Sequence, residues 1–228
     1  MEIERVAGAV GRLLARYAIE GGARVKIAGA NCANGPLLVQ VNLRVRGTPA
    51  RIQTLTPGAG VVLPAVVRLE ELIRRLSTGR QTSLGPDPTR PPLASSGAGV
   101  IIRRKHFTLL MAAPATAVSV MDAMDYDAHL FTDAATGADA IVYRSGPSAI
   151  RFARQRLHDP SAASSVTVDA VLAPELSEAQ AVDRLCDAGL PFLLFTDPGD
   201  GRGHLLYRRY DADLGLVAPV AAEQATTT

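Results

Sequence analysis

The residues best suited to chemistry in this sequence are arginines near its N-terminus. Arg5, Arg12 and Arg16 recur at helical spacing, and on a helix of about 3.6 residues per turn they fall within about 40° of one another. No acidic residue is interleaved on that face. A row of guanidinium groups on the solvent side of a helix can contact several phosphates of a polyanion. The pattern therefore predicts a phosphate-binding face.

Other basic side chains of the same region extend this predicted surface. Residues 1–80 contain 12 Lys and Arg against 5 Asp and Glu, whereas residues 160–228 contain 4 against 10. The excess of positive charge at one end indicates a polyanionic partner for that end. The candidate RNA-binding residues are Arg5, Arg12, Arg16, Arg24, Lys26, Arg44, Arg51, Arg68, Arg74 and Arg75. For any single residue, ordinary solvated charge stays open as the alternative.

Spacings typical of catalytic or metal sites are absent from the sequence. The four histidines form neither an H-x3-H nor an HExxH pattern. Asp133 and Asp197 each precede a predicted hairpin turn, where Asp usually bonds turn amides, and we favour this role over an acid/base pair. Cys32 and Cys186 are too few for a disulfide framework or a zinc site and are expected to be free thiols. We expect no enzymatic activity, no cofactor and no metal.

Two predicted helices and three predicted strands must position the basic residues. Apolar residues from Ile3 to Tyr17 recur at helical spacing, and residues 61–76 carry a second such stripe. Residues 37–46 alternate apolar and polar side chains, as a half-buried antiparallel strand does. The other predicted strands are residues 23–28 and 51–56. Residues 1–78 are therefore predicted to form a domain of two helices packed on a small, mainly antiparallel sheet.

A linker and a repeat follow this domain. Residues 79–98 contain four prolines with Ser, Thr and Gly, a composition typical of a flexible linker. After it the sequence repeats at an offset of 64, with nine identities that include Leu130-Phe131-Thr132-Asp133 returning as Leu194-Phe195-Thr196-Asp197. Each copy is predicted to form a small βαββ unit. The expected segments are residues 99–146, a connecting helix and loop at 147–163 with the helix at 149–157, residues 164–220, and a disordered tail at 221–228.

The two copies are expected to pack on each other. A unit of about 45 to 50 residues buries a core alone only with difficulty. We therefore predict an α+β protein in which the tandem units form an intramolecular pseudo-dimer. Its interface or core is expected to include Phe131, Tyr143, Phe195 and Tyr207.

Motifs in all three folded regions are similar to those of one known family. The first copy, VIIRRKHFTLLMAAPATAVSVMDAMDYDAHLFTDAATGADAIVYR, resembles the C-terminal domain of long-form ribosome hibernation-promoting factors. The second copy ends in HLLYRRYDADLGLVAP, which is similar to the YRR-x-D-x3-GLI-x-P ending of that domain. The N-terminal region, including RLEELIRRLSTGR, resembles the ribosome-binding domain of these factors. Two C-terminal units are most similar to the mycobacterial type, associated with dormancy and hypoxia.

The resemblance departs from the family pattern in two places. The family's first domain begins with a strand, whereas this sequence starts at the predicted helix, so either the true start lies upstream or the sheet is one strand short. The second copy opens with VTVDAVLAPEL in place of a basic strand.

The resemblance implies a ribosome hibernation factor. Such a factor would bind the 16S-type rRNA of the small subunit in the mRNA and tRNA path, inhibit translation and hold single, assembled ribosomes inactive under stress or dormancy. We expect a cytoplasmic protein with neither DNA nor a membrane as partner. In the family one C-terminal domain per chain pairs with that of another chain, whereas here both halves of such a pair lie on one chain, so we expect a monomer with paired C-terminal units. The sequence also has no apolar stretch of about 18 residues and no signal-peptide pattern at its start. The alternative is a regulatory module whose tandem units form a small-molecule pocket.

Overall fold

The computed structural model describes residues 2–29, 37–56, 62–78, 97–145, 149–156, 167–169, 172–209 and 213–220. The chain divides into two compact units. The first comprises residues 1–91 and 119–127, and the second comprises residues 92–118 and 128–228. The predicted linker, apart from residues 97–98, lies outside the described residues, as do Cys32 and the predicted tail.

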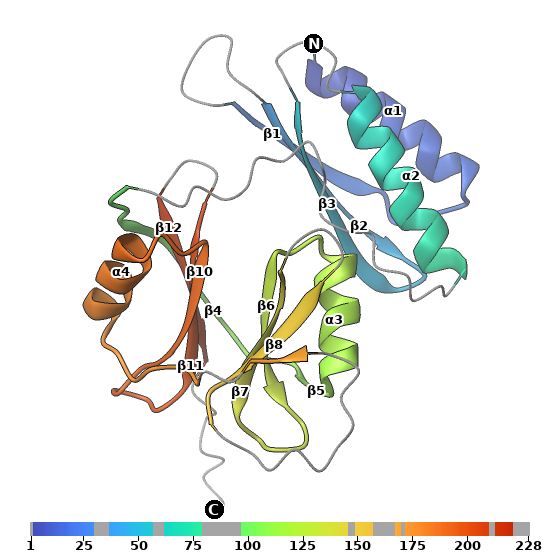
Figure 1. Ribbon diagram of the computed structural model, residues 1–228. Coiled ribbons are helices and arrows are strands. Elements are labelled where there is room, and N and C mark those ends of the chain that lie inside the picture. The colour runs from blue at the N-terminus through green and yellow to red at the C-terminus, as the bar shows by residue number, and fades with distance from the viewer. Residues whose placement is uncertain are drawn as a thin grey trace, which may run out of the picture. The chain divides into compact units, whose positions relative to one another are not determined.

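The first unit contains two helices that cover one face of a three-stranded sheet (Figure 1). Its elements are α1 (Glu2–Arg16), β1 (Ala23–Gly29), β2 (Leu37–Val45), β3 (Thr48–Thr56) and α2 (Val62–Thr78). The sheet is antiparallel in the order β1-β2-β3. The apolar stripe of α1, with Val6 and Val10, packs with Leu69 of α2 against Val41 and Ile52 of the sheet. The predicted two helices and three strands are confirmed in the described residues, although β3 begins earlier than expected, at Thr48.

The second unit contains two sheets. The four-stranded sheet has the order β10-β11-β12-β4, and the five-stranded sheet has the order β5-β6-β7-β8-β9. The first copy of the repeat supplies β4 (Ile101–Phe107), β5 (Met111–Ala112), β6 (Ala128–Asp133), β7 (Asp139–Arg144) and β8 (Ile150–Arg154). The second copy supplies β9 (Thr167–Val168), β10 (Phe192–Thr196), β11 (Gly203–Arg208) and β12 (Leu214–Pro219). Helix α3 (Pro114–Ala123) crosses the boundary between the units, and α4 (Glu178–Asp187) belongs to the second.

The two copies exchange their opening strands. Strand β4 of the first copy pairs in parallel with β12 of the second, and β9 of the second copy pairs in parallel with β8 of the first. In Figure 1 the green β4 lies beside the red β12, although they are far apart in the sequence. An apolar cluster draws Leu130 and Ile141 from the first copy together with Leu194, Leu205 and Val217 from the second. Apolar side chains of both sheets are therefore buried in one cluster.

The predicted connecting helix at 149–157 is wrong. Residues 150–154 form strand β8, which pairs antiparallel with β7. Alanine and arginine favour a helix locally, but Phe152 is fully buried between half-buried neighbours, which is the period of a strand. Pairing with β7 overrides the weak helical preference. At an offset of 64, β8 corresponds to β12, so both copies contain a strand after the predicted hairpin that the predicted βαββ unit lacks.

Candidate nucleic-acid interface

Helix α1 presents its three arginines to solvent. Arg5, Arg12 and Arg16 are exposed, whereas Val6 and Val10 on the other side of the helix are buried. At about 1.5 Å of rise per residue, the three arginines are separated by about 10 Å and about 6 Å along the helix axis. The helix thus separates an apolar face, which packs on the sheet, from a row of cations.

One carboxylate binds to the end of this row. Glu70 of α2 lies 3.2 Å from Arg16 and 3.2 Å from Arg74, and it accepts a 2.7 Å hydrogen bond from the Tyr17 hydroxyl. That hydrogen bond, followed by the charges of Arg16 and Arg74, lowers the pKa of Glu70 against an opposing effect of burial. The side chain of Arg16 is nevertheless 68% exposed. An ion pair this accessible to water is weak, so it leaves Arg16 able to contact a phosphate.

A second basic surface lies on the face of the sheet opposite the helices. Cross-strand register places Arg24 of β1, Asn42 of β2 and Arg51 of β3 in one row. Lys26, Gln40 and Gln53 form the next row, and Gln40 bonds both Asn42 and Gln53 at 3.1 Å. Alternation along the strands separates these polar residues from the buried apolar face. Seven of the predicted basic residues therefore divide between two surfaces, the outer face of α1 and the polar face of the sheet, and the other three, Arg68, Arg74 and Arg75, lie on α2.

The remaining predicted residues differ in exposure. Arg24, Lys26, Arg44 and Arg74 are exposed, and Arg51 and Arg75 are half-buried. Arg44 donates a 2.8 Å hydrogen bond to the carbonyl of Gly47.

Two of the predicted arginines contact residues 125–126, which the first unit includes. Arg68 is 8% exposed and forms a 2.7 Å ion pair with Asp125. Arg51 lies over the ring of Tyr126 at 4.4 Å and donates to the carbonyl of Asp125 at 3.2 Å. Within this unit the guanidinium of Arg68 is the least accessible of the predicted set, because it is buried on Asp125.

The four aromatic residues predicted for the interface or core separate into two pairs. Tyr143 and Tyr207 pack at the rim of the apolar cluster that both copies share. Phe131 and Phe195 are fully buried elsewhere: Phe131 contacts Phe152 of its own copy, with ring centroids 5.9 Å apart, and Phe195 packs in a cluster with α4. Because side chains alternate along a strand, Phe131 lies on the face opposite that of Leu130.

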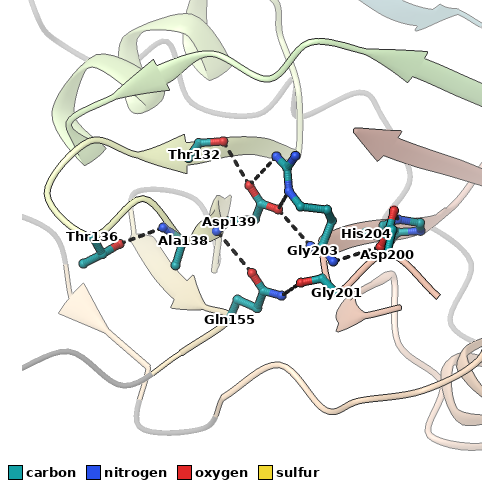
Figure 2. A network of polar contacts seen from close by, with 10 residues as sticks. Thr132, Thr136, Ala138, Asp139, Gln155, Asp200, Gly201, Gly203 and His204 are labelled. Atoms are coloured by element: carbon teal, nitrogen blue, oxygen red, sulfur yellow. Dashed lines mark hydrogen bonds and ion pairs between the residues drawn. The ribbon is translucent and has the colours of Figure 1, made fainter. Parts of the chain in front are cut away.

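A polar network where the copies meet was missed in the sequence (Figure 2). Asp139 of β7 is 1% exposed and accepts hydrogen bonds from Thr132 Oγ1 at 2.9 Å, Arg202 Nε at 2.7 Å and the Gly203 backbone N–H at 2.9 Å. Gln155 adds a 2.7 Å bond to the carbonyl of Gly201. The hydrogen bond to Asp139 raises the pKa of Arg202 above its ordinary value. The offset of 64 aligns Asp139 with Gly203, a difference that could have drawn attention to the site.

Comparison with known proteins adds to this geometry. The sequence model described as "Sigma 54 modulation/S30EA ribosomal protein C terminus" matches residues 97–151. The "Dormancy associated translation inhibitor" of Mycobacterium tuberculosis, in strains CDC 1551 and H37Rv alike, is 48% identical over 228 residues, covering 96% of this chain and 84% of that protein. The chain belongs to the long-form ribosome hibernation factor family. That family consists of ribosome-associated translation inhibitors and is not a known class of enzymes.

The family match covers the first copy of the repeat. The family match spans β4 to the start of β8, which is one C-terminal domain of a hibernation factor. Within the described ranges, no three His, Cys, Asp or Glu side chains group as metal ligands would. Among the helices of those ranges, none is both long and apolar enough to cross a membrane.

Proposed function

We propose that this hibernation factor binds the small ribosomal subunit through its N-terminal domain, in the mRNA and tRNA path, and thereby inhibits translation. Its family and its relatives support translation inhibition and ribosome hibernation as the general function. The site of binding rests on the basic surfaces of the first unit. A ribosome in the cytoplasm is then the partner, with no role for DNA or a membrane.

The exposed arginine row of α1 carries this proposal. Its three guanidinium groups follow one line on a rigid helix, so they can contact successive phosphates without first ordering a loop. Tyr17 is the only aromatic residue among residues 1–80, so base stacking on single strands has little support there. Contacts to the phosphates of folded RNA fit the surface better.

The decisive experiment reverses the charge of this row. The triple variant Arg5→Glu, Arg12→Glu and Arg16→Glu should lose ribosome binding in a sedimentation assay, while its circular dichroism and Tm stay near those of the wild type. In the residual binding at low salt, loss of three phosphate contacts should reduce the slope of log K against log salt by about 2 to 3. Unchanged sedimentation would contradict the assignment to α1.

A matched control separates position from net charge. Arg103→Glu, Arg156→Glu and Arg184→Glu change the net charge equally but lie on exposed positions of the second unit. We expect this variant to sediment with ribosomes far better than the α1 variant. A third variant, Arg24→Glu, Lys26→Glu and Arg44→Glu, tests the polar face of the sheet. Equal losses in all three would mean that affinity follows net charge alone.

We further propose that the paired C-terminal copies make the protein a monomer that holds single ribosomes inactive. The exchanged opening strands and the shared apolar cluster support pairing within one chain. Pairing in cis has an effective concentration that reaches about the millimolar range for short connectors. The alternative small-molecule pocket gains little support, because the buried carboxylate between the copies already binds Arg202.

A further inference from the structure

Equivalent positions of the two copies meet each other but carry different residues. The offset of 64 aligns Asp139 with Gly203 and Ala138 with Arg202. Asp139 accepts the Gly203 N–H at 2.9 Å, and a Cβ atom added to Gly203 would lie only 2.6 Å from the Cβ of Asp139. In a symmetric homodimer, equivalent residues at the twofold axis meet their own kind. Here only one side of the contact has a side chain, and there is space for only one.

The charges at this point are also complementary. Asp139 is buried, and Arg202 binds it through Nε at 2.7 Å and Nη2 at 3.1 Å. A buried carboxylate is costly unless a cation and hydrogen-bond donors compensate it. The first copy therefore supplies the anion, and the second supplies both the cation and the space of a missing side chain.

The exchanged strands show a second asymmetry of this kind. Lys105 of β4 corresponds to Asp169 after β9 at the same offset of 64. The ammonium of Lys105 lies 5.3 Å from the ring centroid of Tyr207, whereas Asp169 accepts a 2.5 Å hydrogen bond from Tyr143 and lies 2.8 Å from Arg151. Tyr143 and Tyr207 are equivalent residues, so each tyrosine meets the opening strand of the other copy.

Strands β8 and β12, which receive the opening strands, also differ at equivalent positions. Arg151 of β8 corresponds to Gly215 of β12. The ring of Tyr207 occupies the space that a Cβ atom on Gly215 would need, whereas Arg151 extends to pair with Asp169. Asp169 therefore meets a cation on the sheet that receives its strand, whereas Lys105 meets a tyrosine ring and no arginine at the equivalent position.

We propose that these two sites form a pairing code that makes each copy specific for the unlike copy. If the first copies of two chains paired, Asp139 would face a second Asp139, with no arginine to compensate the two carboxylates. Lys105 of each chain would take the place of Asp169 beside Arg151. Two second copies would leave Arg202 without its carboxylate and a void at Gly203. The code rests on the proposed monomeric state and deepens it. It excludes a dimer in which the first copy of one chain pairs with the first copy of another.

Two complementary variants of the full chain test the code. In the acid–acid variant, Arg202→Ala with Gly203→Asp gives both copies an Ala-Asp pair. In the base–base variant, Ala138→Arg with Asp139→Gly gives both copies an Arg-Gly pair. Each should lose about 10 °C in Tm, because a buried charge is left uncompensated, and each should stay monomeric in light scattering. Refolded together, they should form a 1:1 heterodimer in which every contact again joins unlike copies.

A combined variant covers the case in which either of these fails to fold. The four substitutions together transfer the carboxylate to position 203 and the Arg-Gly pair to positions 138–139, and should recover at least half of the lost Tm. Ala135→Asp adds a carboxylate to the exposed turn of the same hairpin and should leave Tm within about 2 °C. Any of three results would overturn the code. The acid–acid variant could form a homodimer, its Tm could equal that of the wild type, or the combined variant could show no recovery of Tm. None of these readouts involves ribosomes, so failure of ribosome binding leaves the result intact.

Discussion

Buried ionisable side chains make the second unit sensitive to pH. Burial lowers the pKa of His129 from 6.5 to about 4, and its ring stacks 6.4 Å from that of Phe131. Burial, followed by the hydrogen bond to Asp169, raises the pKa of Tyr143 to about 12. Each group is therefore neutral in the folded protein over a wider pH range than in the unfolded chain.

His129 should destabilise the folded protein in mild acid. The unfolded chain takes up its proton near pH 6.5 while the folded protein resists until about pH 4, so stability that is complete above pH 6.5 falls as the pH drops. At pH 5 the loss is about 2 kcal/mol. Urea unfolding of the wild type and of His129→Gln at pH 7.5 and 5 should show a smaller loss in the variant. Equal losses in the two proteins would contradict this role.

At the scale of elements, strand β8 connects the two copies. It lies between β7 of its own copy and β9 of the other. Its central side chain, Phe152, is fully buried against Phe131, and the guanidinium of Arg154 lies over its ring at 4.8 Å. Loss of this strand would expose β7 and leave β9 without a partner.

Truncation of Phe152 should therefore be strongly destabilising. Phe152→Ala removes a fully buried ring, and we expect a loss of about 3 to 5 kcal/mol in the free energy of unfolding, measured with urea. Arg156→Ala, at an exposed position two residues after the strand, is the control and should change it by less than about 0.5 kcal/mol. A loss below about 1 kcal/mol for Phe152→Ala would place that side chain outside a packed core.

At the scale of the whole molecule, the two ends of the chain differ in charge and, under the proposed function, in partner. The basic end is suited to rRNA, and the repeat at the other end contains both halves of a pairing surface. A domain that pairs within its own chain has no equivalent surface left for a second chain. Under the proposed pairing in cis, this chain would therefore not couple two ribosomes.

The wild-type chain should therefore be a monomer that does not couple ribosomes. Multi-angle light scattering should give a mass near 23.9 kDa at micromolar concentration. A sucrose gradient of ribosomes with excess protein should retain the single-ribosome peak without a ribosome-dimer peak. A dimeric mass together with a ribosome-dimer peak would show that the copies pair between chains.

The sequence alone was sufficient for the elements whose signals are local. The sequence predicts the apolar stripe of α1, the alternation in β2 and the strand at residues 23–28, because such patterns act over a few neighbours. The repeat was equally visible, since it is a property of the sequence itself. The exposure of the α1 arginines followed from the same stripe.

Only the tertiary structure decided which distant segments pair. The helix predicted at 149–157 contains locally helical residues, but residues 150–154 form β8, because a neighbouring strand supplies the hydrogen bonds. The exchange of β4 and β9, the burial of Arg68 and the contact of Asp139 with Arg202 join residues far apart in the chain. Such pairings depend on shape and charge complementarity across an interface, which no local pattern encodes.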